Sequence, residues 1–235
     1  MRLLIVGYGR MGRLVERLSP EFGFQVAGYV DIDNNALGEG IVAAPPADVA
    51  IDFSTASAVV QNLPQLAARG FNVVIGTTGW QAHEPEMRRV VAEKGIGVVV
   101  ASNFSLGVNL FESLVEQAAR LFEGHAEYGA WIHEIHHAAK QDAPSGTALM
   151  LKQSMERAGY SQKIDVASSR AGSVPGTHTV GFDGPFETIT LTHTNRDRAA
   201  FAQGALAAAR WIQGKRGWFT IRDVLGLNSA PSPKP

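Results

Sequence analysis

The sequence predicts an α/β protein, in which a Rossmann-type doubly wound parallel sheet is followed by a smaller α+β domain with a mixed or antiparallel sheet. Three observations support this fold class. Short β-rich runs alternate with helical patterns over the first hundred residues, a glycine-rich turn follows the first run, and the alternation stops after Asn103. Alternating strands and helices are typical of a parallel sheet, whereas consecutive strands are typical of an α+β arrangement.

The first predicted strand is the apolar run 3–7, and a helical pattern follows it at 11–19. This helix has the i, i+3, i+4, i+7 spacing of one apolar face, at Met11, Leu14, Val15 and Leu18. The pattern predicts four more strands and two more helices in this domain: strands 24–31, 49–54, 72–79 and 97–104, and helices 57–68 and 82–94. Small polar residues end each strand, and ligands of such sheets bind outside the carboxyl ends of the strands. We therefore expect several strand ends to line one crevice.

The second half of the chain has a different pattern. Two long helices and two consecutive β-rich runs are predicted, at 107–122, 145–158, 176–182 and 186–194. The alanine-rich segment 198–214 predicts a further helix, because alanine is the best helix former. We expect this helix and segment 219–227 to return to the first domain. Two domains are therefore predicted. The first consists of residues 1–104 together with 198–235, which return to it, and the second consists of residues 105–197.

Composition excludes several classes of protein. The chain has 235 residues, of which 45% are apolar and 18% charged, as is typical of a globular protein of one or two domains. A net charge of −1 without a long basic run predicts no nucleic-acid partner. The absence of cysteine excludes disulfides, thiolate metal sites and a cysteine nucleophile.

The apolar runs are also too short for a membrane segment of about 20 residues. The first of these runs has five residues and is followed directly by glycine, which argues against a signal peptide. We therefore expect a soluble, cytoplasmic protein with no membrane partner, in which only segment 229–235 has the composition of a frayed tail.

The glycine-rich turn has the G-x-G-x-x-G spacing of a dinucleotide-binding loop, at Gly7, Gly9 and Gly12. It follows a predicted strand and opens a predicted helix, the context in which such a loop binds a pyrophosphate. Asp31 ends the second strand, nineteen residues after Gly12. At that distance a carboxylate is expected to hold the adenosine ribose hydroxyls. The alternative is a glycine-rich turn that binds no ligand.

Asp31 also bears on the choice of dinucleotide. A carboxylate at the ribose repels the 2′-phosphate of NADPH, and the residues just after Asp31 include no arginine that would compensate. We therefore expect NADH to be favoured, although Arg10 or another distant cation could still reach a phosphate and admit NADPH.

The segment 134–149, EIHHAAKQDAPSGTAL, contains two adjacent histidines and a lysine. Adjacent residues of a strand face opposite sides, so His136 and His137 cannot both bind one metal ion unless the strand is broken. Lys140 would also repel a cation. We therefore expect no metal.

The helix predicted at 145–158 begins inside the same segment. Asp142 or Ser145 can cap it, and Ser145, Gly146 and Thr147 would present backbone N–H groups and a hydroxyl at the positive end of the helix. With a lysine and histidines nearby, this favours a pocket for a small anionic substrate, with histidine as proton donor. The alternative is a capped helix after a solvated polar loop.

Several segments together resemble the dihydrodipicolinate reductase family. The most specific is EIHHAAKQDAPSGTA (134–148), and it is accompanied in order by the segments GRMG, DFS, GTTG, SNFSLGVN, GTHTVGF and FAQGALAAARW. The resemblance covers nearly the whole chain. It implies reduction of a cyclic dicarboxylate imine, 4-hydroxy-tetrahydrodipicolinate, with NADH or NADPH in diaminopimelate and lysine biosynthesis.

The resemblance also implies roles for particular residues. His136 becomes the general acid, and Lys140 becomes a second proton donor and carboxylate partner. Substrate contacts are implied at His137, Ser145, Gly146 and Thr147. Dinucleotide contacts are implied at Gly7, Tyr8, Gly9, Arg10, Met11, Gly12, Asp31, Gly76, Thr77, Thr78, Ala101, Ser102, Asn103 and Phe104. Residues 1–104 then bind the dinucleotide, whereas 105–197 bind substrate and join a homotetramer. The two domains must close during catalysis.

The chain departs from the family pattern in three respects. Its glycine loop is one residue shorter than is common, Ala138 and Ala139 stand where basic residues are frequent, and 235 residues is short for the family. Two rival functions remain: another two-domain dehydrogenase of an amino-acid derivative, such as an aspartate dehydrogenase, and a dinucleotide sensor without catalysis. The histidine, lysine and helix-start residues argue against a sensor, which would need none of them.

Overall fold

The computed structural model describes residues 1–36 and 38–228, which form two compact units. The first unit consists of Met1–Leu106 and the described residues from Ala199 onward, and the second is Gly107–Arg198. Segment 229–235, predicted as a frayed tail, lies outside the described residues. Among the helices within the described ranges, none combines the length and apolarity needed to cross a membrane.

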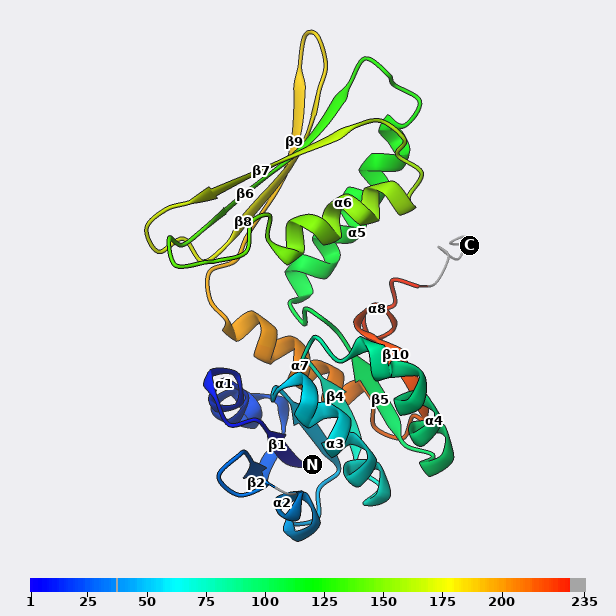
Figure 1. Ribbon diagram of the computed structural model, residues 1–235. Coiled ribbons are helices and arrows are strands. Elements are labelled where there is room, and N and C mark those ends of the chain that lie inside the picture. The colour runs from blue at the N-terminus through cyan, green and yellow to red at the C-terminus, as the bar shows by residue number, and fades with distance from the viewer. Residues whose placement is uncertain (37, 229–235) are drawn as a thin grey trace. The chain divides into compact units, whose positions relative to one another are not determined.

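The first unit contains the predicted parallel sheet, which has six strands in the order β10-β5-β4-β3-β1-β2 (Figure 1). Every neighbouring pair is parallel. The strands are β1 (Arg2–Val6), β2 (Gln25–Val30), β3 (Val49–Asp52), β4 (Asn72–Ile75), β5 (Gly97–Val100) and β10 (Gly217–Thr220). The helices are α1 (Arg10–Leu18), α2 (Glu39–Ala43), α3 (Ala56–Ala68), α4 (Glu84–Lys94), α7 (Ala199–Trp211) and α8 (Ile221–Val224), with 3-10 turns η1 (Ser19–Phe22) and η2 (Gln81–His83).

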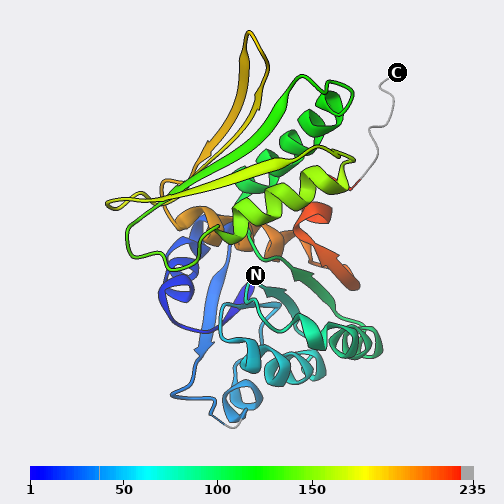
Figure 2. The same ribbon diagram turned by 45° about the horizontal axis from the view of Figure 1, so that its top comes forward.

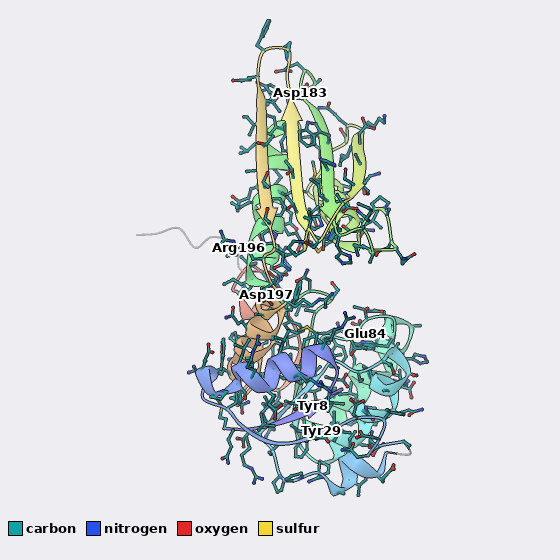
Figure 3. The ribbon with its side chains drawn as sticks, turned by 90° about the vertical axis from the view of Figure 1, so that its left-hand side faces the viewer. Tyr8, Tyr29, Glu84, Asp183, Arg196 and Asp197 are labelled. Carbon is teal, nitrogen blue, oxygen red and sulfur yellow. The ribbon has the colours of Figure 1, made fainter. Side chains whose placement is uncertain are left out.

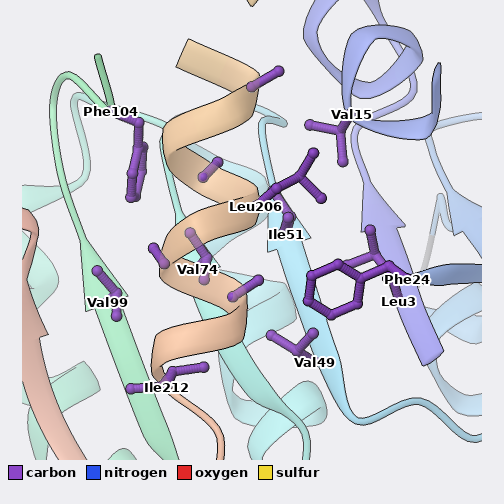
Figure 4. Packing of buried hydrophobic residues seen from close by; sticks show 14 of the residues in the cluster. Leu3, Val15, Phe24, Val49, Ile51, Val74, Val99, Phe104, Leu206 and Ile212 are labelled. Atoms are coloured by element: carbon purple, nitrogen blue, oxygen red, sulfur yellow. The ribbon is translucent and has the colours of Figure 1, made fainter. Parts of the chain in front are cut away.

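Two apolar layers enclose this sheet on opposite faces. Alternate sheet residues such as Val49 and Ile51 pack against α1 and α7 (Figure 4), whereas intervening ones such as Ala50 pack against α3 and α4. Helix α7 has small residues along its buried side. A Cβ at Gly204 would lie 1.7 Å from the carbonyl oxygen of Phe104, so glycine is required for α7 to pack at the end of β5. The alanine-rich helix therefore fixes one of the predicted dinucleotide-binding segments.

The second unit contains a four-stranded mixed sheet in the order β7-β6-β8-β9. Strands β6 and β7 are parallel, and the other two pairs are antiparallel. The strands are β6 (Gly129–His136), β7 (Ile164–Arg170), β8 (Thr177–Asp183) and β9 (Thr188–Thr194). Helices α5 (Leu106–Phe122) and α6 (Gly146–Arg157) cover one face of this sheet (Figures 1 and 2). The fold class predicted from the sequence is thus confirmed.

Alternation along β6 determines which of its polar side chains are buried. Ala130, Ile132, Glu134 and His136 point to the helix-covered face and are buried, whereas the residues between them are half-buried. The two apolar residues and the two polar ones therefore share one face. Glu134 and His136 lie at the carboxyl end of the strand, close to the start of α6.

Candidate functional site

The glycine loop of the first unit links β1 to α1. Gly7 has φ +85°, and a Cβ there would lie 2.6 Å from the Phe53 backbone. A Cβ at Gly12 would lie 2.2 Å from the carbonyl oxygen of Gly7, so packing requires glycine at both positions. A Cβ at Gly9 would meet nothing within 4 Å. Packing therefore does not require glycine at this N-cap of α1, whereas the close approach of an anion to the first turn would.

Asp31 contacts this loop directly. Its Oδ2 accepts a hydrogen bond from the Tyr8 N–H at 2.8 Å, and its Oδ1 accepts one from the Ile32 N–H at 2.8 Å. The Tyr8 ring stacks on Tyr29, with 4.3 Å between ring centroids (Figure 3). The structure therefore brings together the loop and the carboxylate that the sequence pairs by spacing. Of the loop's other residues, Arg10 is exposed and Met11 packs partly against the core.

Two further predicted segments follow neighbouring parallel strands. Gly76–Thr78 follows β4 and Ala101–Phe104 follows β5, so both lie at the same end of the sheet. Asp52, at the end of β3, anchors the first segment by accepting hydrogen bonds from Ser54 Oγ at 2.6 Å and Thr77 Oγ1 at 3.1 Å. Burial raises the pKa of Asp52, although these hydrogen bonds oppose the change. The sequence interpretation gave Asp52 no role of its own.

Glu134 is the centre of a buried polar cluster in the second unit. Its carboxylate accepts hydrogen bonds from both terminal nitrogens of Arg170, at 2.9 and 2.7 Å, and from the Ser145 N–H at 3.1 Å. The Nδ1 of His136 contacts the same carboxylate. Burial raises the pKa of Glu134, but the hydrogen bonds, that of Arg170 foremost, outweigh burial and bring the pKa to about 2. An ionised carboxylate can only accept, so a hydrogen bond to it from His136 requires the hydrogen to be on Nδ1.

Ser145 is the N-cap of α6, as the sequence allows. Its hydroxyl accepts a hydrogen bond from the Ala148 N–H at 3.2 Å and lies 3.1 Å from Nε2 of His178. The His178 ring is 5.1 Å from the His136 ring. Burial, followed by the charge that His136 can carry, lowers the pKa of His178 from 6.5 to about 4. His178 is therefore neutral near pH 7 and can hydrogen-bond to the serine.

The remaining predicted substrate-contacting residues lie at and before the start of α6. Gly146 opens the helix and is followed by Thr147, and a Cβ at Gly146 would meet nothing within 4 Å. Lys140 Nζ donates to both carboxylate oxygens of Asp142, at 2.7 and 2.9 Å, in the loop between β6 and α6. His137 directly follows β6 and is half-buried. Within the described parts of the chain, no cluster of three metal-ligating side chains occurs.

Sequence reasoning missed two members of this cluster, Arg170 and His178, and it also missed the role of Glu134. Strand pairing brings them together, since His136 lies opposite Arg170 on β7 and Glu134 lies opposite His178 on β8. No local spacing in the sequence indicates these pairs. The only available signal was the position of Glu134, two residues before His136 on the same strand face.

Comparison with known proteins gives concordant results. Family models described as the N-terminus and the C-terminus of dihydrodipicolinate reductase match residues 1–104 and 107–225. The 4-hydroxy-tetrahydrodipicolinate reductase of Christiangramia forsetii is 36% identical over 238 residues, covering 96% of this chain and 98% of the relative. That of Archaeoglobus fulgidus is 38% identical over 260 residues, covering 96% and 100%.

A solved structure shares the fold. The dipicolinate-bound dihydrodipicolinate reductase from Paenisporosarcina sp. TG-14 has a TM-score of 0.78 and 22% sequence identity, and the match covers 94% of this chain and 97% of that one. The similarity extends over both units, so the combination of parallel sheet and mixed sheet is a shared architecture.

Proposed function

This chain belongs to the dihydrodipicolinate reductase family, and we propose that it catalyses the NAD(P)H-dependent reduction of 4-hydroxy-tetrahydrodipicolinate, with His136 as general acid. The relatives named above carry this activity in their names. The observation that carries the assignment within this chain is that one carboxylate, Glu134, holds both His136 and the amino-terminal end of α6. A proton donor and an anion site are thereby adjacent.

The glycine loop fits a dinucleotide. Gly9 leaves the first turn of α1 open to a pyrophosphate, and the Asp31 carboxylate, oriented by the Tyr8 and Ile32 N–H groups, retains lone pairs for the ribose hydroxyls. Gly76–Thr78 and Ala101–Phe104 line the nicotinamide side. When bound, the dinucleotide supplies the hydride. Asp31 favours NADH over NADPH, because its charge repels a 2′-phosphate.

The start of α6 binds a substrate carboxylate through Ser145, Gly146 and Thr147. The open space at the Gly146 Cβ position lets a carboxylate approach the backbone, and the helix dipole favours its charge. Lys140 exchanges Asp142 for a substrate carboxylate, and His137 adds a further contact. A relative bound to dipicolinate supports a small dicarboxylate as the ligand class.

The reaction consumes one hydride and one proton and releases one water. The 4-hydroxyl leaves with a proton as water, and the conjugated ring that remains accepts hydride at C4. The ring atom that gains electron density then takes a proton from His136, whose neutral ring is reprotonated by solvent. General acids of this kind contribute about 10²–10⁴-fold to rate.

Further features of the proposal concern the whole enzyme. Residues 1–104 with 198–235 bind the dinucleotide, and 105–197 bind substrate and join the homotetramer through the mixed sheet. Because the glycine loop and His136 belong to different units, turnover requires the units to close. The enzyme acts in the cytoplasm, in diaminopimelate and lysine biosynthesis.

The test uses the condensation product of pyruvate and aspartate semialdehyde, with NADH absorbance as the readout. We expect robust turnover by the wild type and a loss of about 10²–10⁴-fold in His136→Gln, with NADH affinity unchanged. Lys140→Ala should lose activity to a similar degree. His125→Gln is the matched control, because His125 is an exposed histidine of the same unit.

Different outcomes identify different errors. Normal reduction by both His136→Gln and Lys140→Ala would show that the residue roles are wrong. A wild type that binds NADH but does not turn over would favour a sensor. Oxidation of an amino acid such as aspartate, without reduction of the condensation product, would favour another dehydrogenase.

A further inference from the structure

Glu134 and Arg170 form a buried ion pair that the reaction does not itself require. The Glu134 side chain is fully buried, and that of Arg170 is 19% exposed. Burying a charge is unfavourable unless it is paired and hydrogen-bonded, and an apolar pair of similar volume would often serve the fold as well. The presence of this pair beside His136 therefore calls for a function beyond packing.

The geometry around Arg170 makes the pair rigid. Both terminal nitrogens bind the two oxygens of Glu134, and they also donate to the carbonyl oxygens of Ser169, at 2.7 Å, and Asp142, at 2.5 Å. A bidentate guanidinium–carboxylate pair fixes the plane of the carboxylate. His136 and Ser145 are both bound to that carboxylate, so its plane sets the orientation of the imidazole relative to the start of α6.

We propose that Glu134 and Arg170 are positioning residues: Glu134 keeps the hydrogen of neutral His136 on Nδ1, so that Nε2 is the atom that delivers the proton, and Arg170 holds Glu134 in place. This inference rests on the proposed role of His136. A carboxylate bound to one ring nitrogen of a histidine fixes its tautomer and orientation.

The position of Gly176 agrees with this assignment of the two ring nitrogens. Gly176 precedes β8 and has φ +141°, and a Cβ there would lie 3.0 Å from Nε2 of His136. Any larger residue would cover that nitrogen. Glu134 binds Nδ1 of His136, and glycine at position 176 leaves the other ring nitrogen, Nε2, uncovered.

The two partners have opposite electrostatic effects on His136. The Glu134 carboxylate stabilises the imidazolium, whereas the Arg170 guanidinium destabilises it. The other ionisable groups around the cluster are His178 on β8, His193 on β9, and the loop pair of Lys140 and Asp142. Helix α6 adds no charged side chain near its start, since residues 146–151 are uncharged, and its dipole places partial positive charge there.

The experiment measures kcat/KM against pH for Glu134→Gln and Arg170→Gln. A general acid must be protonated, so activity falls as pH rises past a midpoint. We expect Glu134→Gln to move that midpoint about one pH unit lower and Arg170→Gln to move it higher. Arg170→Lys, which keeps the charge, should restore the wild-type midpoint. Lys163→Gln is the control, because it removes the exposed ion pair with Asp165 at the start of β7.

A second measurement does not depend on activity or on a variant that folds. Nitrogen-15 NMR of the wild type, at a pH where His136 is neutral, should place the hydrogen on Nδ1. A hydrogen on Nε2 would overturn the proposal, and so would equal midpoints in Glu134→Gln, Arg170→Gln and wild type. If the Nδ1 tautomer is found but the condensation product is not reduced, the proposed function fails while the positioning role stands.

Discussion

In each unit a helix N-terminus is proposed to bind an anion, and the two helix starts are built from different kinds of residue. In the first unit the loop before α1 consists of small residues that lie together in the sequence, and Gly9 caps the helix without any side-chain hydrogen bond. In the second unit Ser145 caps α6 with its hydroxyl and is held by Glu134 and His178 from two strands. The first site depends on the absence of side chains, and the second on their presence. The proposed dinucleotide site thus depends on glycine packing and a single carboxylate, Asp31, whereas the proposed proton-transfer site uses several fixed polar groups.

The largest effect expected from this comparison is steric. Gly12→Ala should destabilise the protein by about 2–3 kcal/mol, because the added Cβ would press on the Gly7 carbonyl. Gly9→Ala should leave stability nearly unchanged, since its Cβ meets nothing, but should weaken NADH binding. Urea unfolding and NADH titration of both variants separate the two roles. If Gly9→Ala binds NADH as the wild type does, the open first turn of α1 is not the pyrophosphate site.

The sequence predicted the contiguous loop of the first unit better than the cluster of the second unit, whose residues come from separate strands. The glycine loop and Asp31 were found from spacing alone, and the structure shows them in contact. The Arg170 position could not be found, because β7 itself was not predicted: after Ile164 and Val166 its residues are small or polar and lack an alternating pattern. Strand β10 was missed for a related reason, since four residues beginning with glycine give little periodic signal.

The site in the second unit was therefore predicted in part. The contiguous segment from His136 to Thr147 suggested a proton donor beside an anion-binding helix start, and the structure places Ser145 at the N-cap of α6. His136 itself is bound by Glu134, two residues earlier, but the groups that hold Glu134 and Ser145 in turn, Arg170 and His178, lie more than thirty residues away along the chain. Register in a mixed sheet is set by the pairing of whole strands, so such partners leave no local trace. The catalytic and binding roles themselves stay predictions until the variants are measured.

An intermediate effect should appear in the pH dependence of stability. His178 has a pKa of about 4 when folded against 6.5 as an unperturbed group, so the unfolded chain binds more protons between these values and stability falls as pH decreases from about 6.5 to 4. We expect a loss of about 1–2 kcal/mol between about pH 7 and pH 5. His178→Gln keeps a side-chain amide that can hydrogen-bond to Ser145, and it should abolish this part of the decrease in stability. Urea unfolding at several pH values measures it.

The exposed histidine of the same unit provides the control for that measurement. The side chain of His125 is 57% exposed, and His125→Gln should leave the decrease in stability at low pH unchanged. An equal decrease in His178→Gln and wild type would mean that His178 is not the responsible group. The glycine loop of the first unit contains no histidine, so no titration of this kind is expected there.

The smallest effect concerns discrimination between dinucleotides. Asp31→Ala should lower the preference for NADH over NADPH about fivefold to tenfold, or roughly 1 kcal/mol, because it removes both the ribose partner and the charge that repels a 2′-phosphate. Part of the change will reflect the loop, since the Tyr8 and Ile32 N–H groups lose their acceptor.

Asp31→Asn separates the two contributions: its side-chain oxygen can still accept one of these hydrogen bonds, while the negative charge is gone. If Michaelis constants for both dinucleotides are unchanged in both variants, Asp31 does not hold the ribose and serves only to order the glycine loop. If Asp31→Asn alone keeps the wild-type preference, hydrogen bonding rather than charge selects NADH, and the first unit, like the second, would depend on the placement of a polar side chain.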